Sequence, residues 1–219
     1  MSLLLWERRL IFGWAILGVG DSNGDGFDDL VIGSSDDETE ISGRGSVQVH
    51  HGNASGLETT PSRVWTMSTQ WTLFGHTLSS VGDINNDGYP DFSASELFNN
   101  SVWVFQGSPD GFGQNPYTIL TGSNEYGYSM HSAGDVNDDG VQDFLIGYTS
   151  GDGQIKLHLG TNTTSLHESA SIFSDTGGIN QGLGKIISSG GDADRDGMHE
   201  LLYASSTSTY DGTPGGSIV

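Results

Sequence analysis

The sequence contains four copies of one acidic pattern, and this repeat restricts the chain to folds built from similar units. Each copy reads Gly-Asp-x-Asn/Asp-x-Asp-Gly-x-x-Asp/Glu, and successive leading aspartates are 62, 52 and 57 residues apart. An aromatic-Gly or Leu-Gly pair precedes every copy, with 8 residues from its glycine to the aspartate. A spacing held in all four copies indicates tandem structural units. The leading aspartates are Asp21, Asp83, Asp135 and Asp192.

Each unit predicts four short antiparallel strands. A short apolar segment follows each acidic loop, and an alternating segment that ends in glycine comes next, for example Leu30–Gly33 and Ser46–Gly52 in the first unit. A fourth strand is expected before each next unit, at Arg63–Met67, Tyr117–Leu120 and Ser171–Phe173. No segment carries a sustained helical apolar stripe. We therefore predict an all-β chain, a β-propeller of four-stranded antiparallel blades. A β-solenoid is a weaker alternative because its repeats are much shorter.

The repeats predict one propeller-type domain over residues 1–219. Its approximate units are 11–67, 72–121, 124–174 and an incomplete 181–219, with 3–10 as a possible strand that completes a blade. Three arrangements remain open: part of a longer propeller, a small closed ring of about four blades, or half of a ring completed by a second chain. The last unit stops within its third strand, which favours the longer propeller. An open ring would leave an edge available for self-association.

Composition excludes several function classes. The chain has 28 Asp and Glu against 7 Lys and Arg, a net charge of −21, so binding to nucleic acid or to an anionic membrane surface is disfavoured. It has no Cys, which excludes disulfides and thiol catalysis. The longest apolar run, Leu10–Gly20, is too short to span a membrane. This run follows Arg8 and Arg9 and could be a signal-peptide core, but the repeat register accounts for it better.

The acidic loops predict calcium sites. Positions 1, 3 and 5 supply side-chain oxygens, the glycine at position 6 permits a tight turn, position 7 offers its carbonyl, and position 9 closes the loop with a carboxylate. Without a cation these carboxylates would repel one another. About four Ca²⁺ sites are expected, with the ligands Asp21, Asn23, Asp25, Phe27, Asp29, Asp83, Asn85, Asp87, Tyr89, Asp91, Asp135, Asn137, Asp139, Val141, Asp143, Asp192, Asp194, Asp196, Met198 and Glu200.

Other interpretations of the loops fit less well. An EF-hand needs Glu at position 12 and flanking helices, whereas position 12 here lies inside a predicted strand. Magnesium demands stricter octahedral geometry, and transition metals prefer His or Cys ligands. His199 lies at position 8 of the fourth loop, where we do not expect it to bind metal. Turns made by Asp, Asn and Gly alone would explain one copy better than four.

The whole pattern resembles the FG-GAP repeats of the integrin α-subunit β-propeller and its microbial relatives. The aromatic-Gly or Leu-Gly pairs that carry the resemblance are Phe12-Gly13, Phe74-Gly75, Tyr126-Gly127 and Leu183-Gly184. The Ala-Pro of the family pattern is replaced by Gly33-Ser34, Ala94-Ser95, Gly147-Tyr148 and Ala204-Ser205. The resemblance implies structural calcium in the loops, and ligand binding on the opposite face, often together with a partner chain. It therefore implies an extracellular or cell-surface binding or adhesion module.

Two other binding or structural roles compete with adhesion. A carbohydrate-binding, lectin-like propeller could stack sugars on Trp65, Trp71 or Trp103, although packing between blades is the expected role of these rings. The chain could also be a structural spacer in a larger secreted protein. Catalysis is disfavoured because there is no nucleophile elbow or phosphate loop, and because His50 and His158 fall at equivalent strand positions, as structural residues do. The ligand, protein or glycan, is not identified by the sequence.

Overall fold

The computed structural model describes residues 12–35, 44–69, 71–123, 125–149, 153–161, 166–174, 183–193, 195, 199–205, 209–210, 213–214 and 217–218. The segment 3–10, proposed as a blade-completing strand, lies outside the described residues. Across the described ranges the regular elements are strands apart from a single 3-10 turn, η1 (Leu97–Asn99). No helix within those ranges has the length and apolar character needed to cross a bilayer. The all-β prediction is confirmed.

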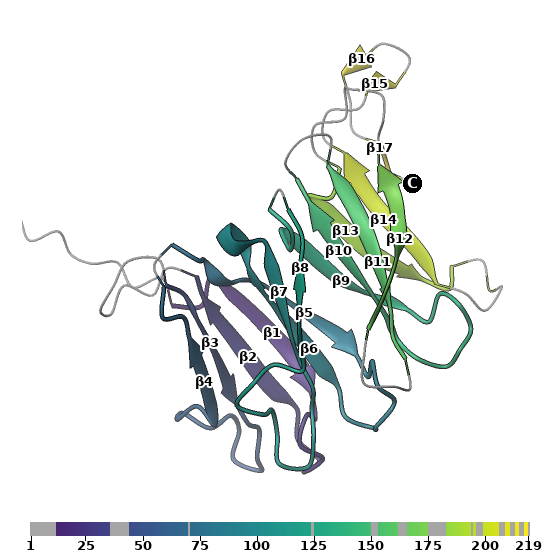
Figure 1. Cartoon of the computed structure of the whole chain (residues 1–219). Helices are drawn as coiled ribbons and strands as arrows, with labels where there is room; N and C mark the ends of the chain where they lie inside the picture. Colours follow the sequence, from purple (N-terminus) through teal and green to yellow (C-terminus); the bar gives the residue numbers. More distant parts are fainter. Residues whose placement is uncertain are drawn as a thin grey trace, which may run out of the picture.

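The strands form consecutive antiparallel sheets, or blades, arranged side by side (Figure 1). Blade 1 contains β1 (Ala15–Gly20), β2 (Asp29–Ser34), β3 (Ser46–His50) and β4 (Arg63–Thr66). Blade 2 contains β5 (Phe74–Gly82), β6 (Asp91–Glu96), β7 (Ser101–Phe105) and β8 (Thr118–Thr121). Blade 3 contains β9 (Ser129–Gly134), β10 (Asp143–Tyr148), β11 (Gln154–Leu159) and β12 (His167–Ser174).

Blade 4 is described as a three-stranded sheet. It contains β13 (Ile186–Gly191), β14 (Glu200–Ser205) and β17 (Ser217–Ile218), while β15 (Thr209–Tyr210) and β16 (Thr213–Pro214) pair with each other. In blades 1 to 3, strands that are consecutive in sequence are neighbours in the sheet. This up-and-down order is the predicted blade, and β4, β8 and β12 overlap the three segments predicted as fourth strands.

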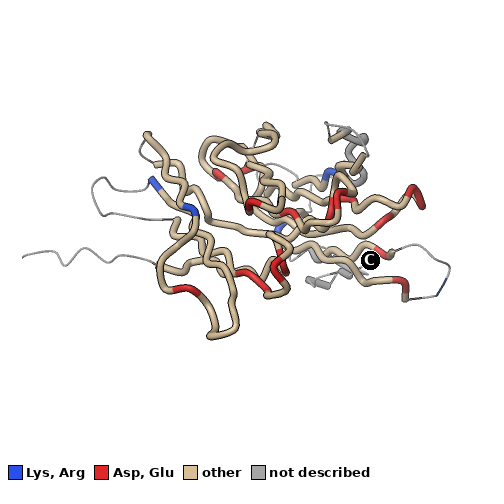
Figure 2. The backbone as a smooth tube through the Cα atoms, turned by 90° about the horizontal axis from the view of Figure 1, so that it is seen from below, with Lys and Arg blue, Asp and Glu red and all other residues tan. Residues whose placement is uncertain are grey.

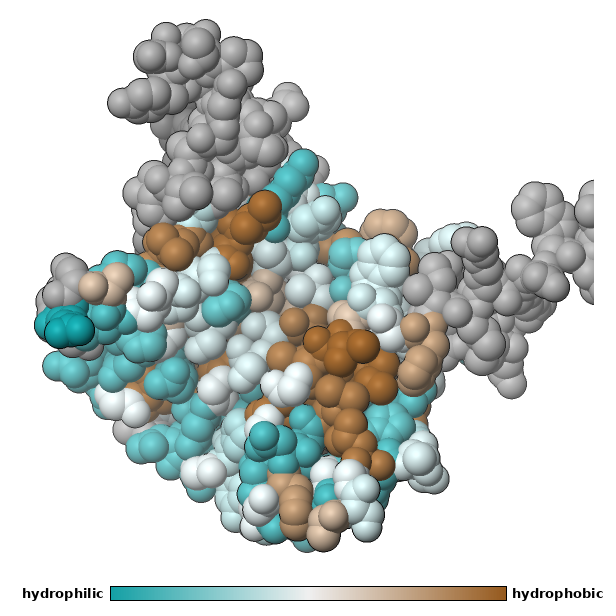
Figure 3. All heavy atoms as spheres, turned by 180° about the vertical axis from the view of Figure 1, so that it is seen from behind, coloured by the Kyte–Doolittle hydropathy of each residue, from teal (hydrophilic) through white to brown (hydrophobic). Residues whose placement is uncertain are grey.

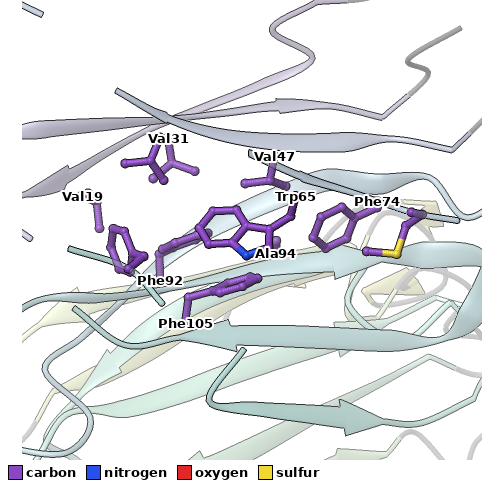
Figure 4. Packing of buried hydrophobic residues seen from close by; sticks show 11 residues of the cluster. Val19, Val31, Val47, Trp65, Phe74, Phe92, Ala94 and Phe105 are labelled. Atoms are coloured by element: carbon purple, nitrogen blue, oxygen red, sulfur yellow. The ribbon is translucent and has the colours of Figure 1, made fainter. Parts of the chain in front are cut away.

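Blades 2 and 3 each bury both faces, one against the blade before and one against the blade after. We call these the preceding face and the following face of a blade. Val31 and Val47 lie on the following face of blade 1 and meet Phe92 and Phe105 on the preceding face of blade 2 (Figure 4). Side chains alternate between the faces of a strand, so Val47 and Val49 lie on the following face of blade 1, while Gln48 lies on its preceding face.

The same packing recurs at the next two interfaces. Val102 and Val104 of blade 2 contact Phe144 and Ile146 of blade 3. In turn, the following face of blade 3 packs on Ile187 of blade 4, through Leu145, Ile155 and Leu157. The hydrophobic core is therefore a series of layers between blades, one layer per interface, and each layer uses equivalent repeat positions.

Aromatic rings fill the layer between blades 1 and 2. The Trp65 ring lies 4.3 Å from that of Phe105, and Phe105 stacks on Phe92 at 4.8 Å. The indole N–H of Trp65 donates to the carbonyl of Gln114. Trp103 packs against the same layer and donates to Glu96. The packing role expected for Trp65 and Trp103 is confirmed, but it was wrong for Trp71, which is exposed.

Close backbone contact between blades explains one pair of glycines. Gly75 follows the aromatic residue at the start of β5, and its φ of +78° suits glycine. Its carbonyl oxygen would lie only 2.2 Å from a Cβ added to Gly33 in β2. Strand β5 can approach β2 this closely only because position 33 has no side chain.

We expect Gly33→Ala to destabilise the fold by about 1–3 kcal/mol, because the added methyl group forces blades 1 and 2 apart. Gly18→Ala in β1 is the matched control, since a Cβ there would meet nothing within 4 Å. Urea denaturation in calcium measures both changes. Equal stability of the two variants would contradict the close-approach explanation.

Candidate metal centre

The four acidic loops share a left-handed backbone at one position. Position 4 of each loop is left-handed, with φ of +75° at Gly24, +57° at Asn86, +58° at Asp138 and +64° at Arg195. Left-handed geometry is unusual for residues other than glycine, and most of all for a long side chain such as arginine. The sequence pattern did not single out position 4, because the residues there differ. Their common φ shows that the repeat specifies a loop shape rather than a residue at this point.

In the second loop, side chains at positions 1, 3 and 5 fold back over the turn. Asp83 accepts the backbone N–H groups of Asp87 at 3.0 Å and Gly88 at 2.8 Å. Asp87 accepts the N–H of Tyr89 at 3.0 Å and the side-chain amide of Asn85 at 2.8 Å. The first and third loops repeat these contacts. The structure thus gathers the predicted oxygen donors of positions 1, 3 and 5 on one turn.

The carboxylate at position 9 is buried and binds backbone amides. In blade 1, Asp29 accepts the N–H of Ser22 at 3.0 Å and that of Gly52 at 2.9 Å. Asp91 makes the same two bonds, with Ile84 and Gly107, and Asp143 makes them with Val136 and Gly160. The oxygens of Asp91 and Asp143 keep further lone pairs for a cation. Position 9 therefore ties its own loop to the end of the third strand of the same blade.

Hydrogen bonds also connect the loops of successive blades. The N–H of Ser108, next to Gly107, donates to the carbonyl of Ser22 at 3.1 Å. The N–H of Thr161, next to Gly160, donates to the carbonyl of Ile84 at 3.2 Å. Ser22 and Ile84 are the position 2 residues whose own N–H groups bind the position 9 carboxylates. A continuous chain of hydrogen bonds thus runs from the first loop to the third.

The electrostatics of the loops favour a cation. Burial raises the pKa of Asp91 to about 7 despite its two backbone hydrogen bonds, and the charges of Asp87 and Asp83 raise it further. Burial likewise raises the pKa of Asp143, with added repulsion from Asp139 and Asp135. These shifts show that the carboxylates of one loop are close enough to repel. A bound divalent cation would relieve both the repulsion and the cost of burial.

The oxygen atoms that the acidic loops offer are the kind of ligand that a hard cation binds. In the described parts of the chain, no three His, Asp or Glu side chains are already gathered as a metal centre. The position 9 carboxylates bind backbone amides instead. A site would therefore combine two carboxylates with the Asn oxygen and the backbone carbonyl of Phe27, Tyr89 or Val141, and position 9 would complete it. Such mixed oxygen sets suit Ca²⁺. In the fourth loop, Asp194, Asp196 and Met198 lie outside the described residues, while Glu200 accepts the N–H of Ala193 at 2.5 Å.

Position 8 of the second, third and fourth loops packs on the blade before it. A Cβ on Gly82, the residue before position 1 of the second loop, would lie 2.6 Å from Gln142 of the third loop. His199 occupies the same place against Gly134, and its Nδ1 lies 3.4 Å from the hydroxyl of Ser189. In these loops the side chain at position 8 therefore lies against the neighbouring blade.

We call β1, β5 and β9, the first strands of blades 1 to 3, the inner strands, and a row of rings lies at the end of them remote from the acidic loops. Trp14, His76 and Tyr128 each follow the glycine of an aromatic-Gly pair, at the end of the inner strand remote from its acidic loop. The Trp14 and His76 rings are 5.5 Å apart, and His76 and Tyr128 are 6.1 Å apart. A six-residue strand separates Trp14 from the loop after β1 by about 20 Å. We call these residues the ring row; sequence reasoning missed them, although the fixed position after the glycine marks them.

Acidic residues dominate the charge around the sheets. Figure 2, which views the molecule from below Figure 1, shows Asp and Glu in short runs along the chain, with few Lys and Arg.

Burial lowers the pKa of His76 in the ring row, with a smaller opposing effect from Glu125. The lowered pKa favours the neutral form of this imidazole, and Glu125 is a negatively charged neighbour of the row.

Comparison with known proteins bears on both the loops and the blades. The sequence profile described as FG-GAP-like repeat matches residues 21–93 and 83–146, more than half of the chain. The chain belongs to the FG-GAP-like repeat family. Both matches begin at the leading aspartate of an acidic loop, so the FG-GAP repeats coincide with the units identified from spacing. The predicted family and propeller blades are confirmed.

Several curated relatives of this FG-GAP protein are integrin alpha chains. It is 32% identical to integrin alpha-6 of Gallus gallus over 149 residues, which cover 64% of this chain and 13% of that protein. It is 30% identical to integrin alpha-7 of Homo sapiens over 157 residues, which cover 67% and 13% of the two chains. The match thus spans about an eighth of these relatives.

We expect Asp25→Asn to remove one calcium site and leave the others, because it removes a charged oxygen at position 5 of the first loop. The number of Ca²⁺ ions bound, measured by equilibrium dialysis, should fall from four to three. Asp28→Asn is the matched control: it removes the same charge from the same loop at position 8, and should retain four. An unchanged number in the Asp25 variant would reject the first loop as a site.

The position 9 carboxylate should matter even without calcium. We expect Asp29→Asn to lose about 1–3 kcal/mol in excess chelator, because an amide cannot accept N–H groups on both sides. Asp25→Asn should change stability in chelator by less than about 0.5 kcal/mol, since that side chain is exposed. Urea denaturation in chelator compares the two variants, and an equal loss in both would contradict a separate structural role for position 9.

Proposed function

We propose that this chain is a calcium-stabilised FG-GAP propeller module that binds a protein partner outside the cell or at its surface, without catalysing a reaction. The ring row is the observation that carries the proposal. It places an exposed tryptophan, a neutral imidazole and a tyrosine from three successive blades on one surface. Aromatic side chains of this kind are enriched in protein interfaces. The relationship to integrin alpha chains supports an adhesion role.

In this proposal the acidic loops stabilise the fold and the ring row binds the partner. Calcium in the acidic loops holds the blades in register, while the ring row contacts the partner at the opposite ends of the inner strands. The acidic loops would each bind calcium with the modest affinity typical of extracellular modules, roughly 10⁻⁴–10⁻³ M. Sites of this strength fill where calcium is millimolar, which supports an extracellular or cell-surface location.

Calcium should raise the melting temperature through linkage. In 10 mM calcium, about 10 to 100 times such a dissociation constant, each bound ion adds about 1.4–2.7 kcal/mol to the free energy of unfolding. We expect the melting temperature to fall by at least roughly ten degrees when 10 mM calcium is replaced by chelator. A melt that is the same in both conditions would reject calcium stabilisation while leaving partner binding open.

Partner binding is tested with the calcium-loaded chain on two probe sets, a panel of purified extracellular proteins and a glycan array. We expect calcium-dependent binding to a member of the protein panel, reduced at least tenfold by Trp14→Ala. Trp71→Ala is the matched control, because Trp71 is also exposed but lies outside the ring row. Binding that Trp14→Ala leaves intact, or binding to glycans alone, would overturn this assignment.

A carbohydrate-binding role is the second candidate, and one hollow favours it. A cavity of about 310 Å³ lies beside the second acidic loop. Its lining includes Asp87, Gln106, Ser108, Asn115 and Tyr117. Polar groups around one aromatic ring suit a polyhydroxylated ligand. Glycan binding that Asn115→Ala abolishes and Trp14→Ala leaves intact would favour this second role.

A further inference from the structure

One aromatic ring joins the first two acidic loops. Tyr89 occupies position 7 of the second loop, and Gly24 occupies position 4 of the first. A Cβ added to Gly24 would lie 2.9 Å from Cε1 of Tyr89 and 3.5 Å from its hydroxyl oxygen, so the edge of the ring lies on the backbone of the first loop. Figure 3 shows mainly hydrophilic residues toward the lower edge of the rear view, so the contact is made at a polar end of the blades.

Glycine at position 4 gives the ring its place. The other loops carry Asn86, Asp138 or Arg195 there, with the same left-handed backbone. The third loop offers no ring, because its position 7 residue is Val141, which packs on Gly160 of its own blade. Among the first three loops, a ring contact is therefore particular to the first and second.

The ring is attached to a backbone that a bound cation would fix. The N–H of Tyr89 donates to Asp87 at 3.0 Å, and its carbonyl is the position 7 donor of the second loop. The Cβ of Tyr89 lies 2.9 Å from a Cβ added to Gly107, whose N–H donates to Asp91 at 2.8 Å. Ordering of the second loop therefore also holds the ring that lies on the first.

We propose that Tyr89 couples calcium binding in the first and second loops, so that occupation of either loop raises the calcium affinity of the other. The coupling rests on the calcium sites of the proposed function. An ordered second loop holds Tyr89 against Gly24 and so restricts the turn between the donors Asn23 and Asp25. A site that is ordered in advance loses less conformational entropy on binding. Such coupling is reciprocal, with typical factors of about 5 to 150.

The sign of the effect separates this contact from simple electrostatics. Two divalent ions repel each other, so repulsion alone would leave the second loop with a higher calcium affinity when the first loop is empty. Coupling through Tyr89 gives the second loop a lower affinity in that case. A lowered affinity therefore cannot come from the lost repulsion between the ions.

An NMR titration with Ca²⁺ reads each loop separately through its position 6 glycine. The N–H groups of Gly26, Gly88 and Gly140 each donate to the leading aspartate of their loop at 2.8 Å. We expect Asp25→Asn to lower the calcium affinity reported by Gly88 at least about fivefold, and that reported by Gly140 by less than about twofold. Asp87→Asn should lower the affinity reported by Gly26 by the same factor.

Two comparisons isolate the ring contact from the change in charge. Asp28→Asn removes the same charge from the first loop at position 8, and should change the affinity reported by Gly88 by less than about twofold. In a Tyr89→Ala background, which keeps the position 7 carbonyl, adding Asp25→Asn should likewise change it by less than about twofold. Tyr89→Phe is the matched control, because it keeps the ring and should retain the full factor.

Gly24→Asn tests the contact from the other side. It gives the first loop the position 4 residue of the second and fills the place of the ring, so it should also abolish the coupling. Coupling that survives both this variant and Tyr89→Ala would overturn the proposal, as would loops that bind calcium independently in the wild type. Either result would leave calcium binding intact, whereas glycine amides that do not respond to calcium would reject the calcium sites themselves.

Discussion

The buried position 9 carboxylate is the interaction on which the loop face of this protein depends. Asp29, Asp91 and Asp143 each hold the start of an acidic loop and the end of a third strand through backbone N–H groups. Burying a carboxylate is costly unless hydrogen bonds or a cation compensate. The raised pKa of Asp91 shows that backbone amides offset only part of this cost. A positive charge close to these carboxylates would therefore offset the rest of the cost of burying them.

The repeats provide order at two levels. Within a blade, the loop and the third strand are joined by one carboxylate. Between blades, a backbone bond from Ser108 or Thr161 joins one loop to the next, and apolar layers join the sheets. The two levels meet at position 2, where Ser22 and Ile84 bond both to their own blade and to the next. This arrangement leaves the opposite ends of the inner strands free for a role other than stability.

Much of this organisation could be predicted from the sequence, because it is periodic. The spacing from the aromatic-Gly pairs to the acidic loops located the blades, and alternation located the strands. The features that were missed depend on neighbours that a linear pattern does not reveal. Asp29 also links its loop to the end of the third strand by accepting the N–H of Gly52, which lies 23 residues away. The contact of Gly33 with Gly75 and the ring row both depend on how one blade stands against the next.

Trp71 illustrates the limit of reasoning from residue type. Tryptophan is usually well buried, and Trp65 and Trp103 follow that tendency. Trp71 lies in the connection between β4 and β5 rather than within a strand, has a left-handed backbone with φ of +60°, and is exposed.

The faces of the blades have an evolutionary implication. Because every described junction joins equivalent positions, a segment of about one repeat could be duplicated or deleted while leaving compatible surfaces on either side. Gene duplication would then change the number of units without requiring new complementary mutations. Divergence could concentrate on the ends of the inner strands, where the residue after each glycine is Trp14, His76, Tyr128 or Lys185.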